Sequence, residues 1–449
     1  MPRLWPTGGL WRHADFLKLW SAETISQVGT QVSGLALPLV AILVLDASAF
    51  EVAALATVQF LPFILFTLPA GVWVDRLPRR PILISGDLGR AALLATIPIA
   101  YAADVLTLTQ LFAVAFLVGI CTVFFDVAYQ SYLPALVDRE QIIDGNSKLE
   151  ISRSASQVGG PGLGGALVEI FTAPYAVLVD AISFLGSGLF ILGIRKKEEP
   201  PVVARDADGR KPSLWVELKE GLRFVLGNPN LRAQAGCTAT SNLFSSVAFS
   251  IYLVFAVREL DLSAGLIGVI FSIGAAGSLA AAFSSTRMSS RFGIGPTTIG
   301  VGLLWGPATL VVAFAPSGNA SIPILVASQL VLGFSIVVYN IVQVSYRQAI
   351  CPQRLQGRMN SVMRFMVWGT IPIGTLLGGA LGTWVGLRET IAVGAIGSGL
   401  AVLWIVFSPQ RHLREMPEPI EDEPAAAAEL GAALSGVGDP RPATDETAA

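Results

Sequence analysis

Charged and reactive residues are scarce in this chain. Only 14% of its 449 residues are Asp, Glu, Lys or Arg, whereas a soluble domain carries about 25%. The chain has three cysteines and two histidines. Cys121, Cys237 and Cys351 lie far apart and form no C-x-x-C pair, so the sequence predicts neither a disulfide framework nor a zinc site. No metal site is expected.

Motifs for nucleotide binding and for hydrolysis are missing as well. The chain contains no G-x-x-x-x-G-K-[ST] motif and no Gly-Lys pair at all. It also contains no H-E-x-x-H and no G-x-S-x-G motif. The net charge of −2 gives no electrostatic reason to expect a nucleic-acid partner. We therefore expect neither an enzyme nor a cofactor.

Apolar residues are what the chain has in excess. They make up 53% of it, and the mean hydropathy is +0.63. An ordinary core cannot bury so much apolar surface, so lipid must be the main solvent. A spanning helix needs about 20 mainly apolar residues, and twelve segments qualify: 18–45, 51–74, 81–103, 107–136, 147–170, 174–194, 232–257, 264–286, 294–316, 320–350, 358–385 and 388–408. The sequence predicts an all-α protein of the cell (inner) membrane with twelve transmembrane helices.

The basic residues indicate the orientation of these helices. The first apolar segment is long and has no cleavage site behind it, so we interpret it as a retained helix and not as a signal peptide. Of the 30 Lys and Arg residues, only Arg258 and Arg388 fall in loops that follow odd-numbered segments. Because cytoplasmic loops carry the excess of Lys and Arg, both termini are predicted to be cytoplasmic.

The two halves of the chain resemble each other. A shift of 215 residues places Asp46 on Asp261, and a shift of 214 places the GGAL of 164–167 on that of 378–381. Such matches predict two parallel six-helix repeats, with a substrate site between them near the middle of the membrane.

The repeats lead to a division of the chain into four parts. We predict an N-terminal bundle, a cytoplasmic linker, a C-terminal bundle and a disordered cytoplasmic tail, at 1–194, 195–231, 232–408 and 409–449. The linker should contain an amphipathic helix on the membrane surface, because apolar residues recur at near-helical spacing at Leu214, Leu218, Leu222 and Val225.

At this point the residues resemble a known family. The loop after the second segment matches the G-x-x-x-D-R-x-x-R-R signature of the major facilitator superfamily at Gly71, Asp75, Arg76, Arg79 and Arg80. The fifth segment carries GGPGLGG, similar to the glycine–proline motif of antiporters in that superfamily, at Gly160, Pro161, Gly164 and Gly165. Residues 17–40 and 124–147 resemble the branch that holds macrolide exporters and the enterobactin exporter.

The charged loop is predicted to act as a conformational latch. Asp75 ends a helix whose C-terminus is already negative, so its carboxylate is better satisfied by another helix N-terminus or by an Arg. The resemblance implies a contact with residues 357–360 of the other half, which would hold the cytoplasmic side shut. The alternative is that Arg76, Arg79 and Arg80 only anchor the topology.

Ionisable residues inside the segments are candidates for proton coupling, because charge within a membrane is costly. Asp126 is the first candidate, since the resemblance implies that its helix lines the cavity. The other candidates are Glu23, Asp87, Arg90, Glu150 and Arg153. For each of them a structural role stays open. Asp126 could form a fixed ion pair with an Arg, Asp87 and Arg90 could pair near the loop charges, and Glu23 could be an N-terminal helix charge.

Amides and aromatic residues are predicted to line the cavity. The candidates are Gln27, Gln31, Phe124, Tyr129, Gln130, Asn242, Phe244, Tyr339, Asn340 and Gln343. The alternative for each amide is a hydrogen bond between helices. A cavity with apolar walls and few fixed charges suits lipophilic or amphipathic small molecules.

These expectations combine into one functional prediction with two alternatives. We predict export of small organic compounds by proton antiport, with the small molecule, protons and the lipid bilayer as partners, and a monomer as the working unit. An uptake symporter or facilitator on the same fold is the first alternative. A membrane sensor or scaffold that transports nothing is the second.

Overall fold

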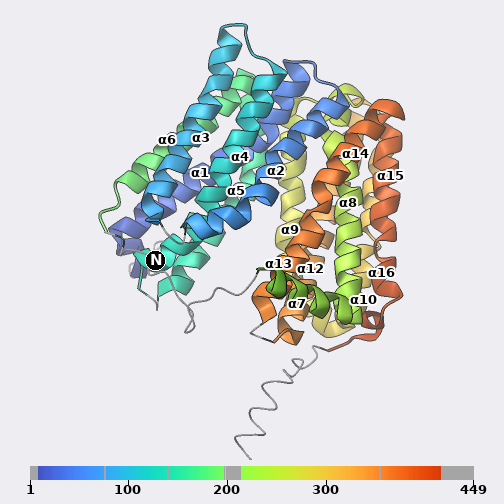
Figure 1. Cartoon of the computed structure of the whole chain (residues 1–449). Helices are drawn as coiled ribbons and strands as arrows, with labels where there is room; N and C mark the ends of the chain where they lie inside the picture. Colours follow the sequence, from blue (N-terminus) through green and yellow to red (C-terminus); the bar gives the residue numbers. More distant parts are fainter. Residues whose placement is uncertain are drawn as a thin grey trace, which may run out of the picture.

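The computed structural model describes residues 9–74, 77–138, 141–196, 198, 214–352 and 355–415. Within these ranges the protein is helical and contains no strand. The first half, on the left of Figure 1, consists of a short 3-10 helix and six α-helices: η1 (Gly9–Arg12), α1 (Ala14–Leu43), α2 (Ala49–Val74), α3 (Arg79–Ala102), α4 (Leu108–Leu136), α5 (Ile142–Phe171) and α6 (Ala173–Leu192).

The second half stands beside the first and contains several broken helices (Figure 1). Its elements are α8 (Pro229–Arg258), α9 (Ala264–Phe292), α10 (Ile294–Gly302), α11 (Trp305–Ala313), η3 (Gly318–Ser321), α12 (Ile322–Ile350), α13 (Gln356–Trp368), α14 (Thr370–Trp384), α15 (Leu387–Leu400), α16 (Leu403–Val406) and η5 (Pro409–His412). Two of the breaks precede a proline. Pro307 follows the break between α10 and α11, and Pro372 follows the break between α13 and α14. Proline has no backbone N–H, so neither residue can donate the hydrogen bond that would continue the helix.

The described chain contains eleven segments that are long and apolar enough to cross a membrane. Three of them, Ile294–Ala313, Arg358–Trp384 and Leu387–Val406, run through helix breaks. Helix α5 has 30 residues but is not among the eleven, because its first half is polar. Large apolar side chains are exposed on the outer surface, for example Phe283 (83%) and Trp384 (82%). These features confirm the prediction of a helical membrane protein, whereas the count of twelve spans stays a prediction.

Rare backbone conformations recur in the two halves. Asp46 and Asp261 have φ of 47° and 53°, and the shift of 215 residues relates them. Thr172 has a φ of 84° and Gly386 a φ of 120°, and the shift of 214 residues relates these two. A positive φ is uncommon outside glycine. The repeat found in the sequence therefore corresponds to matching turns in the fold.

The two ends of the bundle are called the linker end and the sealed end. The linker end is the end at which α6 stops and α8 starts, at the bottom of Figure 1. The sealed end is the opposite one, where α1 stops and α9 starts. Helix α7 (Leu214–Gly227) lies at the linker end, where Glu220 pairs with Arg358 of α13. A helix thus occupies the predicted position, and the domain limits themselves stay a prediction.

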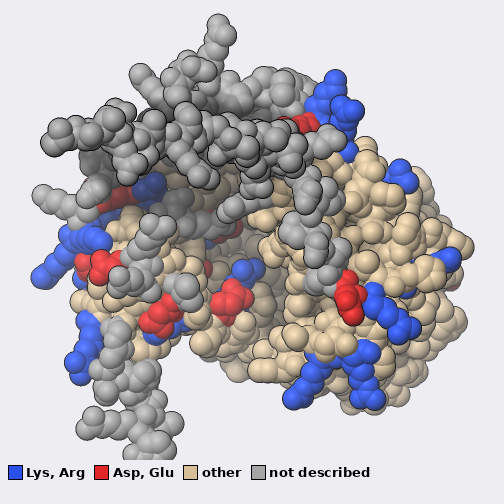
Figure 2. Space-filling model, turned by 90° about the horizontal axis from the view of Figure 1, so that it is seen from below, with Lys and Arg blue, Asp and Glu red and all other residues tan. Residues whose placement is uncertain are grey.

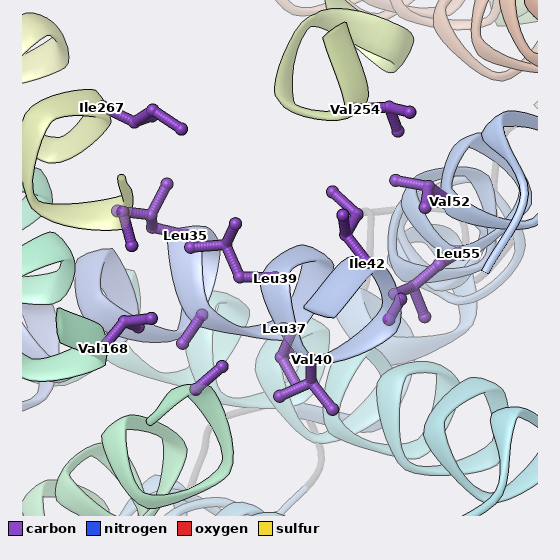
Figure 3. Close-up of a cluster of buried hydrophobic side chains, with 14 of the residues drawn as sticks. Leu35, Leu37, Leu39, Val40, Ile42, Val52, Leu55, Val168, Val254 and Ile267 are labelled. Atoms are coloured by element: carbon purple, nitrogen blue, oxygen red, sulfur yellow. The ribbon is translucent and has the colours of Figure 1, made fainter. Parts of the chain in front are cut away.

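A hydrophobic core joins the halves at the sealed end. Figure 3 shows Leu35 and Ile42 of α1 close to Ile267 of α9 and Val254 of α8. All four side chains are at least 95% buried. The core belongs to one continuous cluster that includes residues of both halves. The two halves therefore share one hydrophobic core at this end.

Glycines of the α5 motif make this close packing possible. Gly165 lies against the Ala264 carbonyl of α9, and Gly268 lies against the Pro161 carbonyl, so a Cβ at either glycine would overlap with backbone. The Gly162 N–H also donates to Ser272 Oγ of α9 at 2.8 Å. The motif thus lets α5 and α9 approach across the boundary between the halves.

Candidate substrate cavity

A large cavity lies between the two halves on the linker side of this core. Its volume is about 2110 Å³, and its walls come mainly from α1, α4 and α5 on one side and α8, α12 and α13 on the other. Asn146 and Asn360, close to the linker end of their helices, belong to the lining. Figure 2 views the molecule from that end and shows the hollow between the halves. The cavity therefore opens at the linker end.

Polar contacts between the halves close the other end. Arg258 Nη2 pairs with Asp46 Oδ1 at 2.7 Å and donates to the Ala47 carbonyl at 2.9 Å. Deeper in, Thr57 Oγ1 of α2 and Thr375 Oγ1 of α14 lie 2.6 Å apart, and both are buried. Among the described residues, the exposed ion pair and the buried hydroxyl pair thus add to the hydrogen bonds between α5 and α9, where Gly265 N–H also donates to Glu169 Oε2 at 3.1 Å.

Part of the predicted latch lies within the described residues. Arg79 binds Glu198 through its backbone N–H (2.7 Å) and Nη1 (3.0 Å). Arg80 donates to the Ile191 and Leu192 carbonyls at the end of α6. All these partners lie between residues 79 and 198, so among the described residues neither arginine forms a hydrogen bond or ion pair with the second half. Asp75 and Arg76 lie outside the described residues, as do the surroundings of Gly71, so the contact between the halves stays a prediction.

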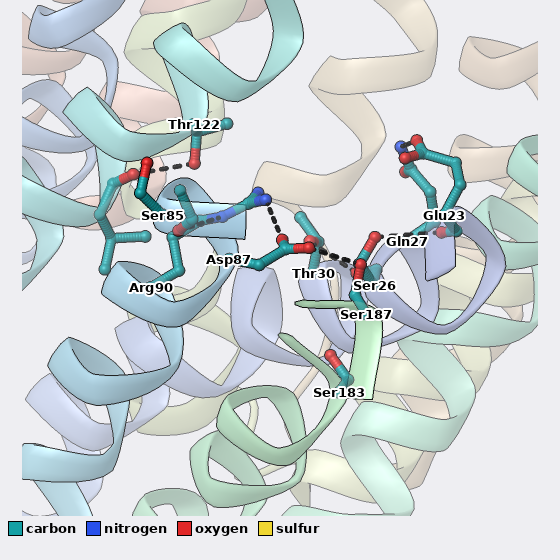
Figure 4. Close-up of polar contacts among 12 residues, drawn as sticks. Glu23, Ser26, Gln27, Thr30, Ser85, Asp87, Arg90, Thr122, Ser183 and Ser187 are labelled. Atoms are coloured by element: carbon teal, nitrogen blue, oxygen red, sulfur yellow. Dashed lines mark hydrogen bonds and ion pairs between the residues drawn. The ribbon is translucent and has the colours of Figure 1, made fainter. Parts of the chain in front are cut away.

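Glu23 is a buried carboxylate on α1 beside the cavity. Its residue is 7% exposed, and its Oε1 accepts a hydrogen bond from Gln27 Nε2 at 2.7 Å (Figure 4). Its other oxygen, Oε2, has no hydrogen-bond partner among the described residues. The sequence suggested an N-terminal helix charge, and this was wrong. Helix α1 begins at Ala14, where His13 accepts from the Phe16 N–H and caps it.

Asp126 of α4 is exposed to the cavity and belongs to its lining. Within the described part of the chain it forms no ion pair and no hydrogen bond. The guanidinium groups of Arg90, Arg153 and Arg364 are close enough to act on it electrostatically. The alternative of a fixed ion pair with an Arg is therefore not realised, and the carboxylate is available to a solute.

Asp87 and Arg90 of α3 form a buried ion pair. Asp87 Oδ1 lies 2.5 Å from Arg90 Nη2, and Asp87 Oδ2 accepts from Ser187 Oγ of α6 at 2.6 Å (Figure 4). The Arg90 guanidinium lies between the rings of Phe125 (4.2 Å) and Phe184 (4.0 Å). The predicted pair exists, but it is completed by Ser187 and two aromatic rings and not by the loop charges.

Glu150 and Arg153 of α5 also belong to the cavity wall. Their charged atoms are 3.9 Å apart, and their side chains are 66% and 58% exposed. The pair is loose because both side chains reach into the open part of the cavity. An exposed pair of this kind contributes at most about 1 kcal/mol.

Six of the ten predicted cavity residues line the cavity: Gln27, Gln31, Tyr129, Asn242, Asn340 and Gln343. Three others do not. Phe124 packs on Trp73 with ring centroids 5.8 Å apart. Phe244 lies against Gly397 of α15. Tyr339 is buried, with its hydroxyl 2.7 Å from Thr238 Oγ1. The side chain of Gln130 lies outside the described residues.

Several lining residues were missed in the sequence. Phe125, the neighbour of Phe124, faces the cavity, and so do Phe63 and Trp368. Two basic residues of the second half, Arg347 and Arg364, also line it. The sequence could have indicated Arg347, because it follows the predicted lining residue Gln343 by four positions and so lies on the same face of α12.

Similarity to known proteins identifies the family of this chain. The sequence profile of a family described as transmembrane secretion effectors, within the major facilitator superfamily, matches residues 9–431. The chain belongs to this family. It is therefore a multi-pass transporter of the cell membrane and not an enzyme.

Characterised relatives and solved structures agree with the family. The chain is 29% identical over 385 residues to the multidrug efflux pump Tap of Mycolicibacterium fortuitum, covering 83% of this chain and 90% of that protein. It is 27% identical over 436 residues to the pump of the same name from Mycobacterium tuberculosis, covering 93% and 99%. A bacterial homologue of the iron transporter ferroportin in an inward-facing state has the same fold, with a TM-score of 0.68, 17% identity and coverage of 89% and 99%.

Proposed function

We propose that this protein exports small amphipathic organic compounds by proton antiport and alternating access. The observation that carries the proposal is a wide cavity between the halves with two carboxylates, Glu23 and Asp126, that lack complete partners within the described residues. The efflux pumps among its relatives support the direction and the kind of cargo.

The linker end is the cytoplasmic end in this proposal. Of the basic residues near the sealed end, Arg258 pairs with Asp46 and Arg388 pairs with Glu259 at 2.9 Å. Most of the other Lys and Arg residues that the structure describes lie toward the linker end, as expected for a cytoplasmic side. Cargo would enter the cavity from the cytoplasm in the conformation described here and leave after the sealed end has opened.

The two carboxylates supply the coupling. Asp126 is open to the cavity, so a proton and a cargo molecule can compete for it. Glu23 is buried, and its unpartnered Oε2 is a place for a proton, because a buried charge without a partner is costly. Protons that enter from outside would displace the cargo. The return of the empty, protonated carrier would then release them to the cytoplasm.

The latch belongs to the opposite conformation. In it, Asp75 would contact the start of α13 near Asn360 when the cytoplasmic side is shut. In the conformation described here Asn360 lines the open cavity, which is compatible with a disengaged latch. We propose a monomer as the working unit, since one chain contains the whole cavity.

The test is uptake into inside-out vesicles that contain the purified protein, with an imposed pH gradient and a panel of amphipathic compounds. We expect accumulation of at least one compound that stops when the gradient is collapsed. Asp126→Asn and Glu23→Gln should each lower it at least tenfold. Asp104→Asn, the same change at an exposed residue outside the cavity, should not.

Two other results would each support an alternative. Accumulation that needs the reversed gradient would indicate a symporter. Absence of movement for every compound, with a folded protein, would favour the sensor or scaffold. Gradient-driven uptake that Asp126→Asn and Glu23→Gln leave intact would contradict the assigned roles of the two carboxylates.

A further inference from the structure

The charges in the cavity are divided between its two walls. Among the described lining residues, the first half contributes both signs and the second half only positive charge. The ionisable side chains of the first half are Glu23, Arg90, Asp126, Glu150 and Arg153. Those of the second half are Arg347 and Arg364.

Pairing within the first half leaves carboxylates in excess there. Arg90 is held by Asp87 at 2.5 Å, and Arg153 lies 3.9 Å from Glu150. The ionisable lining residues without an ion-pair partner among the described residues are then Glu23 and Asp126 on one wall and Arg347 and Arg364 on the other. A solute in the cavity meets negative charge on one side and positive charge on the opposite side.

The Arg364 guanidinium of the second half is available to a solute. Arg364 is exposed, and its guanidinium lies over the Trp368 ring, 4.3 Å from the centroid, with no carboxylate partner among the described residues. Arg347 Nε is buried and likewise lacks a hydrogen-bond partner there. A planar guanidinium that is held by an aromatic ring still has donor groups free for an anionic oxygen.

Aromatic residues also form part of the cavity wall. Phe63, Phe125 and Trp368 belong to the lining. The volume of about 2110 Å³ exceeds that of a typical pocket for a drug-sized molecule, which is about 300–1,000 Å³. A molecule with an apolar body can therefore lie here while its polar groups reach both walls.

We propose that the preferred cargo is zwitterionic and amphipathic, with its ammonium group on Asp126 and its carboxylate on Arg364. Its apolar body lies against the aromatic residues of the wall. The proposal rests on the proposed function and names the class of its substrate. A molecule with only one of the two charges would leave one wall group in the cavity unpaired.

The size of the preference follows from the contacts. A hydrogen bond to a charged group changes affinity by about tenfold or more. Removal of either charge from the cargo should therefore lower affinity about tenfold. Removal of both should lower it further, since only the apolar contacts remain.

A set of four probes on one scaffold tests this directly. Nε-dansyl-lysine carries a free ammonium and a free carboxylate, its methyl ester is a cation, its Nα-acetyl derivative is an anion, and the acetylated ester is neutral. Binding is measured by dansyl fluorescence with the purified full chain in nanodiscs, without any gradient. We expect the zwitterion to bind about tenfold more tightly than the cation or the anion.

Variants assign each charge to its wall. Asp126→Asn should remove the advantage of the ammonium group and leave that of the carboxylate. Arg364→Gln should do the reverse. The matched controls are Asp104→Asn and Arg287→Gln, the same changes at exposed residues outside the cavity. The exchange Asp126→Arg with Arg364→Asp should restore the preference for the zwitterion, which a merely unfolded variant cannot do.

Two outcomes overturn the proposal. The first is equal binding, or no binding, of all four probes to a folded protein. The second is a zwitterion preference that persists unchanged in both Asp126→Asn and Arg364→Gln. Because binding is measured without a gradient, a zwitterion preference together with no proton-driven transport would contradict the proposed function and leave the site intact.

Discussion

The buried pair of Thr57 and Thr375 offers a sharp test of how the sealed end is held. Thr57 Oγ1 lies 3.0 Å from the Ala53 carbonyl of its own helix and 2.6 Å from Thr375 Oγ1. Thr375 Oγ1 in turn lies 2.9 Å from the Pro372 carbonyl of its own helix, so whichever hydroxyl donates the bond between the halves, the other donates to its own helix. Thr375→Val then removes that bond and leaves the Thr57 hydroxyl with its intrahelical partner.

The magnitude follows from the loss of one hydrogen bond. A net contribution of about 0.5–1.5 kcal/mol corresponds to about a two- to twelvefold change in the equilibrium between conformations. The population with an open sealed end should rise by that factor. Thr57→Val should have a similar effect, and the double variant should equal either single one, because both changes remove the same bond.

The assay is a distance measurement by electron paramagnetic resonance. Spin labels at Asp104→Cys and Asn319→Cys, in a background without the native cysteines, report the separation of the halves at the sealed end, where both positions are exposed. Thr383→Val is the control, because Thr383 donates only to the Gly379 carbonyl of its own helix. A Thr375→Val distribution equal to that of the control, or additive effects in the double variant, would refute the reasoning.

Three further changes have defined outcomes. Arg258→Gln removes the exposed ion pair at the sealed end, which should be worth less than about 1 kcal/mol, so the same distance distribution should shift less than about fivefold. Gly165→Leu should force α5 and α9 apart, and cysteine labelling at the sealed end should increase strongly, whereas Gly186→Ala, where a Cβ meets nothing within 4 Å, should leave it unchanged. Asp87→Ala leaves the Arg90 guanidinium buried without its carboxylate, which costs about 3–5 kcal/mol, and the melting temperature of the detergent-solubilised protein should fall by several degrees.

Much of the fold could be predicted from the sequence because lipid imposes a simple rule. A spanning segment must satisfy its backbone hydrogen bonds internally, which a helix does, so long apolar runs locate most of the helices. The repeat was visible because Asp46 and Asp261 occupy equivalent turns with positive φ, where few residue types are tolerated. The helix breaks before Pro307 and Pro372 were not predicted, although the proline positions were visible.

The cavity lining could be predicted only in part. Helix α4 is apolar on its lipid-facing side and on its packed side, so periodicity does not indicate which face is inward. For this reason the sequence predicted Phe124 as a lining residue, whereas its neighbour Phe125 lines the cavity. Arg347 and Arg364 were missed for another reason. Basic residues near the cytoplasmic side already have an explanation in topology, and their position on the cavity face needs the structure.

The most direct test of proton antiport is the internal pH of proteoliposomes that contain the purified protein, measured with a trapped pH dye. A transported compound is added outside, with no pH gradient imposed at the start. Our account predicts that the lumen becomes more alkaline as the compound enters, and that Asp126→Asn abolishes the change. A lumen that becomes more acidic, or compound entry without any pH change in the unaltered protein, would contradict it.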